Sequence, residues 1–402
     1  MKVLHVISSM DPKMGGVCEA VRITAVGLQT LGIHNEVVCV DEETYHQDTT
    51  YTQHNLGPSK NPWYYSNRLL PWLNENIGRF DAVIVHGLWL YHGYAANKAF
   101  QNLKKKGGSS LKTKLFVMPH GMLDPYFQRA KTRRLKALRN VIYWGLIEKH
   151  IINNADELLF TCQTELQLAR EPFWPYKPKR ETVVGLGVEA PPAYNASMLS
   201  VFEEKIPAVK GSPYLLFLSR IHEKKGVDML LHSYTKIIEQ QTSDAGQQDL
   251  TNVPKLVIAG PGLESDYGLQ LKETVDNSEL LSKLVHFPGM LTGEAKWGAF
   301  YGCEAFVLPS HQENFGIAVV EALTCNKPVL ISNQVNIWPE IEQAGGAIVA
   351  DDTLIGTFEM LDKWSGLAST DKDKMAAGAR HCYEKHFAID AVINNFYQIL
   401  KN

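Results

Sequence analysis

Two loops in the C-terminal half carry charged side chains at spacings that suit phosphate and sugar chemistry. In the first, Glu313 and Glu321 flank Gly316, and the loop follows the apolar run 305–308. That order predicts a strand, a loop and a helix beginning near Gly316, whose unpaired N–H groups can hold a phosphate. Helical rise would separate the two carboxylates by roughly 12 Å. One could then reach a sugar and the other a ribose; a capping Glu313 and a solvated Glu321 are the plain alternative.

The second loop holds two cations five positions apart. Arg220 and Lys225 follow the apolar run 214–218 and precede Gly226. A guanidinium presents a planar fork to phosphate oxygens, and a lysine adds a movable point charge. Together they can neutralise a departing diphosphate, so that two cations and a helix end take the place of a metal ion.

Two loops of the N-terminal half also follow apolar runs. Gly15 and Gly16 precede a helical pattern, where glycine lets backbone approach a ligand, although an ordinary turn explains the pair equally well. His86 and Trp89 come at the end of the run 82–85. Both could line an acceptor pocket, because aromatic faces pack against sugar rings, and packing of Trp89 in a core is the equal alternative.

The loops must be positioned by the short apolar runs that precede them. These runs are separated by helix-length segments, a pattern that predicts strands of parallel sheets buried on both faces. The pattern weakens through a stretch with five prolines between 172 and 192 and then restarts, which predicts two doubly wound domains of Rossmann type. We expect domains at 1–195 and 196–384, with a C-terminal helix at about 385–402 packed back on the first. Ligands bind at the strand carboxyl ends of such sheets, so the chemistry is expected in a cleft where the two sheets face each other.

The two charged loops together resemble the signature of the retaining glycosyltransferases of family four, which have the GT-B fold. The glutamate pair with seven intervening residues and the arginine and lysine five apart before a glycine carry the resemblance, which covers nearly the whole chain. For this family it implies that Arg220 and Lys225 hold the donor diphosphate. It also implies that Glu321 contacts the ribose and Glu313 the transferred sugar.

The resemblance extends to further positions. His120, in the loop 119–125, matches the histidine that family members place beside the donor sugar, and Asp124 in the same loop is assigned to the acceptor side. The remaining donor-binding positions that it implies come from glycine loops and the predicted helix start: Gly15, Gly16, Gly260, Gly262, Met290, Asn314, Phe315, Gly316 and Ile317.

Composition narrows the partners. The net charge of −3 over 402 residues gives no reason to expect nucleic-acid binding. No Asp-X-Asp motif follows a strand and no cluster has metal-ligand spacing, so we expect neither a metal nor another cofactor. The six cysteines are scattered singly, as reduced thiols are, and the first residues do not resemble a signal peptide, which predicts a cytoplasmic location. The basic segment 129–139 predicts weak peripheral contact with a membrane or, equally, a solvated helix face.

These observations predict a metal-independent transfer of a hexose from a nucleotide diphosphate sugar to a saccharide or lipid-linked saccharide. UDP-glucose is the first expectation for the donor, ahead of UDP-galactose, an N-acetylhexosamine donor and GDP-mannose. The loops 120–125 and 338–340 resemble bacterial or cyanobacterial enzymes of polysaccharide biosynthesis, of the heterocyst envelope type. Two alternatives stay open: an epimerase or hydrolase of sugar nucleotides with the same fold, and a noncatalytic donor-binding subunit.

Overall fold

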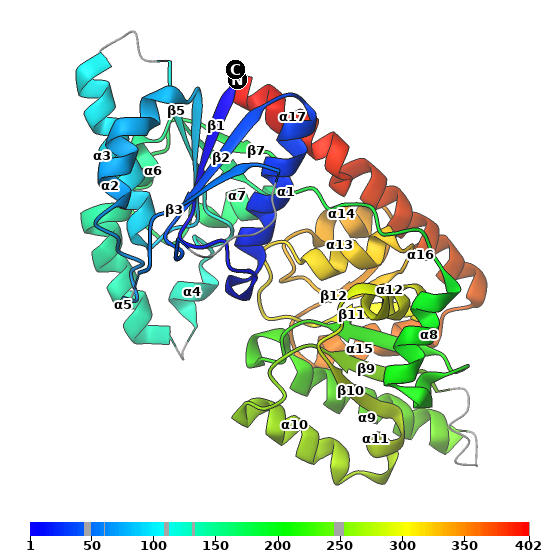
Figure 1. The fold of residues 1–402 in the computed structure, drawn as a ribbon. Coiled ribbons are helices and arrows are strands. Elements are labelled where there is room, and N and C mark those ends of the chain that lie inside the picture. The colour runs from blue at the N-terminus through cyan, green and yellow to red at the C-terminus, as the bar shows by residue number, and fades with distance from the viewer. Residues whose placement is uncertain (44–49, 60, 108–111, 131–132, 245–252, 402) are drawn as a thin grey trace. The chain divides into compact units, whose positions relative to one another are not determined.

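The chain folds into two compact units (Figure 1). The computed structural model describes residues 1–401 except 44–49, 60, 108–111, 131–132 and 245–252. Unit 1 comprises Met1–Gly187 and Ile389–Asn402, and unit 2 comprises Val188–Ala388. The chain therefore enters unit 2 a few residues before the predicted boundary at 195.

Unit 1 is built on a seven-stranded sheet in the order β3-β2-β1-β4-β5-β6-β7, and all of its pairings are parallel. Its central strands are the predicted apolar runs, buried along nearly their whole length because helices cover both faces. The strands are β1 (Lys2–Val6), β2 (His34–Cys39), β3 (Thr52–Asn55), β4 (Ala82–His86), β5 (Lys114–Met118), β6 (Glu157–Phe160) and β7 (Glu181–Val183).

The helices of unit 1 pack on its sheet in two layers, each with its own apolar core. The helices are α1 (Gly16–Thr30), α2 (Leu69–Asn76), α3 (Tyr91–Gly107), α4 (Tyr126–Arg129), α5 (Arg134–Tyr143), α6 (Lys149–Asn154), α7 (Gln163–Ala169) and α17 (Ile389–Lys401), with the short turns η1 (Pro12–Met14), η2 (Ile77–Arg79) and η5 (Trp144–Glu148). The C-terminal helix α17 packs in this unit, and Ile393 lies against Gly27 of α1 so closely that a Cβ there would come within 2.5 Å of it. Apolar side chains of α17 thereby complete one core of unit 1.

Unit 2 is built on a six-stranded parallel sheet in the order β10-β9-β8-β11-β12-β13. Its strands are β8 (Tyr214–Leu218), β9 (Lys255–Ala259), β10 (Val285–Gly289), β11 (Ala305–Leu308), β12 (Val329–Ser332) and β13 (Ala347–Ala350). Its helices are α8 (Ala196–Lys205), α9 (Val227–Asp244), α10 (Asp266–Asp276), α11 (Glu279–Leu284), α12 (Gly293–Gly302), α13 (Ile317–Thr324), α14 (Trp338–Gln343), α15 (Leu354–Ser365) and α16 (Ser369–Cys382), with the short turns η6 (Pro207–Val209), η7 (Glu223–Lys225) and η8 (Tyr383–Phe387).

Each sheet has one point at which the strand order reverses. In unit 1 that point lies between β1 and β4, and in unit 2 it lies between β8 and β11. Loops that leave the carboxyl ends of two such strands run to opposite sides and open a crevice, which is where ligands bind in open parallel sheets. The loops 219–226 and 309–316, which carry the predicted cations and Glu313, flank the reversal point of unit 2.

Candidate functional site

The two charged loops of unit 2 are joined by hydrogen bonds. The backbone oxygen of Lys224 accepts from the Ser310 hydroxyl at 3.0 Å and from the His311 N–H at 2.8 Å. Gly226 lies against the backbone of Pro309, and a Cβ at that glycine would stand 2.3 Å from the Pro309 oxygen. Its φ of +66° is in the left-handed region, so both space and conformation call for glycine here.

This contact brings Lys225 and Glu313 together. The Lys225 ammonium forms an ion pair with the Glu313 carboxylate, and the lysine is buried, with 7 % of its surface exposed. The backbone of Glu313 is held by the loop that follows β12. Its N–H donates to the Gln334 oxygen and its own oxygen accepts from the Asn336 N–H, both at 2.9 Å. A cation and a carboxylate predicted from separate loops therefore lie at one point of the sheet edge.

Arg220 lies on the same loop as Lys225, and its side chain is exposed. Within the described ranges its guanidinium makes neither a hydrogen bond nor an ion pair. Its backbone is fixed by the loop after β9: Ile221 donates to the Pro261 oxygen at 2.8 Å, and a Cβ at Gly260 would stand 1.9 Å from the Ser219 oxygen. Gly262 approaches Ile221 in the same way. The arginine is thus an accessible cation on a rigid loop.

Helix α13 begins where the sequence predicts it, with Gly316 as its N-cap at φ +77°. Glu321 lies in the second turn of α13 and accepts from the Lys296 ammonium of α12 at 2.6 Å. Lys296 was not anticipated, because it lies 25 positions upstream inside a predicted helix and no spacing rule connects it to Glu321. Any group that Glu321 binds would share its carboxylate with this lysine.

The other donor-side positions divide into exposed and buried ones. Met290 is exposed and directly follows β10, while Asn314 and Ile317 are half-buried beside Gly316. The Phe315 ring is buried and meets Phe387 edge-on at 5.6 Å. Phe315 therefore stabilises the core of unit 2, and only its backbone can face a ligand.

In unit 1, the reversal point lies beside a chain of histidines. His86 ends β4, and its two ring nitrogens lie 3.0 Å from Nδ1 of His5 on β1 and 3.0 Å from Nε2 of His120. His86 is 1 % exposed, so its side chain cannot line an acceptor pocket as the sequence predicts. It contacts His120 instead. His120 is partly exposed and has a φ of +52°, in the loop directly after β5.

Trp89 is held in a strained backbone conformation, with φ at +71°. Its backbone N–H donates to Oε1 of Glu148 at 2.6 Å, and its indole N–H donates to the Met122 oxygen at 3.2 Å. The ring packs at 5.3 Å from the Phe173 ring, so core packing accounts for much of it. Burial raises the pKa of Glu148 to about 8, which makes this carboxyl group neutral at pH 7.

The two remaining positions of unit 1 have mainly backbone roles. Gly15 is the N-cap of α1 at φ +95° with open space around it, and Gly16 is the first residue of the helix. Asp124 is buried, and its carboxylate accepts from the Tyr126 N–H at 2.8 Å at the start of α4. In the structure this carboxylate holds the first turn of α4. Its place on the acceptor side stays a prediction.

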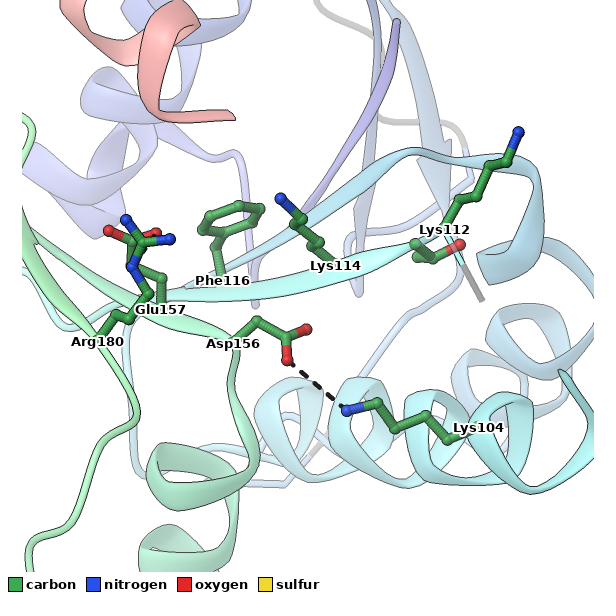
Figure 2. Close-up of a pocket in the computed structure, with 8 residues that line it drawn as sticks. Lys104, Lys112, Lys114, Phe116, Asp156, Glu157 and Arg180 are labelled. Carbon is green, nitrogen blue, oxygen red and sulfur yellow. Dashed lines mark ion pairs between the residues drawn. The ribbon is translucent and has the colours of Figure 1, made fainter. Parts of the chain in front are cut away.

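A hollow of about 350 Å³ lies at the opposite, amino edge of the unit 1 sheet (Figure 2). It is lined by the starts of β5 and β6, and Lys104 crosses it to Asp156 at 3.6 Å. Glu157 pairs with Arg180 at 3.8 Å on the other side. Because ligands of parallel sheets bind at the other edge, we do not place the site here.

Three general features of the described residues bear on the chemistry and its setting. Among the described residues, no three histidine, cysteine or carboxylate side chains converge as a metal site would require. All six cysteines lie among the described residues, are buried and form no disulfide. Within the described ranges, no helix combines the length and apolar character that a membrane crossing requires.

The charged half of the site lies in a segment that is similar to a known family. Residues 201–356 match the family model of glycosyl transferases group 1. The matched segment spans β8 to β13 and includes Arg220, Lys225, Glu313 and Glu321.

Curated relatives match parts of the chain. An uncharacterized glycosyltransferase of Methanocaldococcus jannaschii is 29% identical over 33% of this chain and 30% of its own length. A D-inositol 3-phosphate glycosyltransferase of Frankia alni is 32% identical over 29% of this chain and 27% of its own. The alpha-monoglucosyldiacylglycerol synthase of Streptococcus pneumoniae is 25% identical over 59% and 53%. The chain thus spans between about a quarter and about a half of these relatives' length.

Solved structures share the whole fold. Sucrose-phosphate synthase of Thermosynechococcus elongatus matches with a TM-score of 0.72 at 16% identity, covering 100% of this chain and 98% of that one. HepE of Anabaena, solved with UDP and glucose, matches with a TM-score of 0.71 at 14% identity and covers 100% of both chains. Two parallel sheets flanked by helices and these neighbours give the chain the GT-B fold, as the sequence predicts.

Proposed function

We propose that this protein is a retaining, metal-independent glycosyltransferase that moves a hexose from a nucleotide diphosphate sugar to a saccharide or lipid-linked saccharide. The observation that carries the proposal is that exposed Arg220 shares the loop after β8 with Lys225, whose ion pair with Glu313 lies at the strand-order reversal of unit 2. An unpaired guanidinium and an ammonium at the strand carboxyl ends suit a ligand with two phosphates.

The residues suggest how the reaction proceeds. The bond between the anomeric carbon and the diphosphate oxygen breaks while Arg220, Lys225 and the N-terminal end of α13 stabilise the charge on the leaving diphosphate. The acceptor hydroxyl attacks the same face, and its proton passes to the leaving phosphate oxygen. Glu313 holds the sugar and Glu321 the ribose, and each forms an ion pair with a neighbouring lysine.

UDP-glucose is the donor that the comparisons favour. HepE was solved with UDP-glucose as well as with UDP and glucose, and the pneumococcal relative is named for a glucosylated lipid. We therefore propose glucose as the transferred hexose and polysaccharide or glycolipid biosynthesis as its setting, on the cytoplasmic side of a membrane.

The test is sugar transfer by the purified protein with a chelator present. We expect UDP release from UDP-glucose to depend on an added saccharide acceptor, and Arg220→Ala and Lys225→Ala each to lower turnover roughly 10²–10³-fold. Lys272→Ala, an exposed position on α10 of the same unit, is the matched control and should keep full activity. Near-normal rates in both site variants would contradict the assignment, and full turnover without an acceptor would instead support a hydrolase or epimerase.

We also propose that unit 1 contacts an anionic lipid surface through α5. One face of this helix and the turn after it exposes five apolar side chains by 54–85 %: Leu135, Leu138, Val141, Ile142 and Leu146. The predicted basic segment flanks this face, although Lys131 and Thr132 lie outside the described residues, and no acidic residue occurs between positions 125 and 147. An exposed apolar stripe within a basic segment suits insertion between anionic headgroups.

Flotation with vesicles of phosphatidylcholine and phosphatidylglycerol tests this contact. We expect the wild-type protein to float at low salt and the double variant Leu138→Glu/Ile142→Glu to stay unbound. Leu269→Glu, which changes a comparably exposed leucine on α10, should float like the wild type. Absence of vesicle binding at low salt would refute the contact.

A further inference from the structure

Four polar side chains form a continuous hydrogen-bonded chain across unit 1. Asn35, His5 and His86 lie on the neighbouring strands β2, β1 and β4, and His120 lies in the loop after the next strand, β5. Oδ1 of Asn35 lies 3.1 Å from Nε2 of His5, and 3.0 Å separates the facing nitrogens at each of the two following steps, His5 to His86 and His86 to His120. Asn35, His5 and His86 are buried, whereas His120 at the end is partly exposed.

The direction of this chain is fixed at its buried end. The amide nitrogen of Asn35 donates to the Ile33 oxygen at 3.0 Å, so the amide cannot rotate by 180° without leaving that carbonyl unpaired. Its Oδ1 therefore faces His5 and can only accept, which places the His5 proton on Nε2. A neutral imidazole has one donor and one acceptor nitrogen, so Nδ1 of His5 must accept.

The same rule, one donor and one acceptor nitrogen in each neutral imidazole, applies to His86 and then to His120. Nε2 of His86 donates to His5, which leaves Nδ1 of His86 as an acceptor. Nε2 of His120 then donates to His86, and the proton of His120 is committed to that bond. Nδ1 of His120 carries the lone pair, and among the described residues it has no hydrogen-bond partner.

We propose that Asn35, His5 and His86 are positioning residues that lock the tautomer of His120, so that its Nδ1 presents an acceptor to a hydroxyl group of the transferred sugar. The tautomer lock is a property of unit 1 alone. Only its use on a sugar rests on the proposed function.

The surroundings keep the chain neutral. Burial lowers the pKa of His5 and of His120 to about 4 each, and burial together with the neighbouring histidines holds the pKa of His86 well below its ordinary value. His92 also contacts His86, but only at the backbone: a ring nitrogen of His92 lies 2.9 Å from the backbone oxygen of His86. Among the residues that the structure describes, the two ring nitrogens of His86 are therefore engaged by His5 and His120 alone. Because the amide of Asn35 takes up no proton at neutral pH, the hydrogen-bonded side chains do not conduct protons. They only fix which nitrogen of His120 carries its proton.

An acceptor-only nitrogen discriminates between sugars. A sugar hydroxyl can donate to Nδ1 of His120, whereas a carboxylate has only lone pairs to offer and leaves both groups unpaired. The lock therefore favours a donor sugar with a free hydroxyl at this point over a uronic acid. With the C6 hydroxyl at Nδ1, UDP-glucose should bind at least about tenfold more tightly than UDP-glucuronate, which carries a carboxylate at that carbon and keeps its other hydroxyls.

Two-bond ¹H–¹⁵N correlation spectra of histidine-labelled protein test the lock without any sugar. We expect His5, His86 and His120 all to be neutral with the proton on Nε2, their signals being assigned from single His→Phe variants. His150→Gln, at an exposed position on α6, is the control and should leave the three signals unmoved. A proton on Nδ1 of His120, or an imidazolium there at pH 7, would overturn the lock.

Asn35→Asp tests the consequence for the sugar. A carboxylate at position 35 stabilises the imidazolium of His5, which donates from both nitrogens and so reverses every bond of the chain. Nδ1 of His120 then carries a proton, and the preference for UDP-glucose over UDP-glucuronate should fall by about tenfold. An unchanged preference with a reversed tautomer would overturn the sugar contact. Should the variant not fold, the wild-type spectra still decide the lock, and failure of every nucleotide sugar to bind would count against the proposed function alone.

Discussion

At the scale of single residues, Lys225 and Glu313 depend on each other. Each neutralises the other in a partly buried position, and removing one partner of such a pair leaves an uncompensated charge. In the proposed reaction the lysine of this pair faces the diphosphate and the glutamate faces the sugar, which are adjacent in the donor. Stability and activity can therefore be separated by mutation.

We predict that Lys225→Met lowers the free energy of unfolding by about 1–3 kcal/mol, because it leaves the Glu313 carboxylate without its partner. The double variant Lys225→Met/Glu313→Gln should recover part of that loss while staying inactive. Denaturant titrations of the two single variants and the double variant give the coupling energy. Additive effects of the two single substitutions in the double variant, that is, a coupling energy of zero, would show that the pair contributes nothing.

Glu148 predicts a pH dependence of stability. Its pKa is raised by burial to about 8, above the value near 4.5 of an exposed glutamate. The unfolded chain therefore loses its proton first, and stability is full below about pH 4.5 and falls as the pH rises to about 8. Because Glu148→Gln cannot ionise, this variant should lack that loss and be the more stable protein at pH 8–9.

Thermal unfolding between pH 5 and 9 measures this difference. Each kcal/mol recovered by the glutamine should raise the Tm by roughly 2–4 °C for a domain of this size. The accepting oxygen for the Trp89 N–H is kept in the glutamine. Parallel pH profiles of wild type and variant would mean that Glu148 is ionised in the folded protein.

At the scale of elements, the contact between the loops after β8 and β11 sets the site. Gly226 and Gly211 have nearly the same φ, +66° and +67°, but only Gly226 has a neighbour within reach of a Cβ. We predict that Gly226→Ala costs about 1–3 kcal/mol more than Gly211→Ala, because it adds a clash with the Pro309 oxygen to the common backbone strain.

Donor binding distinguishes the two glycine variants further. Gly226→Ala must push the loops apart and should weaken binding of UDP, whereas Gly211→Ala, in the turn after η6, should bind as the wild type does. Equilibrium unfolding and calorimetric titration with UDP give the two readouts. Identical behaviour of both variants would rule out the close contact of the loops.

The elements themselves were largely predictable from the sequence. Apolar runs such as 305–308 became buried strands, and Gly316 became the N-cap of a helix, because local pattern and left-handed backbone decide both. Lys296 and the burial of Phe315 could not be predicted, because they depend on how helices pack side by side. The histidine chain was missed for the same reason: Asn35, His5 and His86 become neighbours only through the strand order.

At the scale of the whole molecule, the chain crosses between units twice. The prolines between 172 and 192 predict where the chain first crosses, and in the structure unit 2 begins at Val188. Val188 forms a parallel bridge with Ala388, the residue at which the chain leaves unit 2. A parallel bridge between residues 200 positions apart has no local signature. The charged loops, by contrast, lie wholly inside unit 2, so the central claim about the donor can be tested on binding alone.

The most direct test is calorimetric titration of the 402-residue chain with UDP-glucose in the presence of a chelator. The account predicts metal-free binding that falls at least about tenfold in Arg220→Ala and in Glu321→Ala and is unchanged in Lys272→Ala. Absence of binding by UDP-glucose and by every other nucleotide sugar, from a protein shown to be folded, would contradict it.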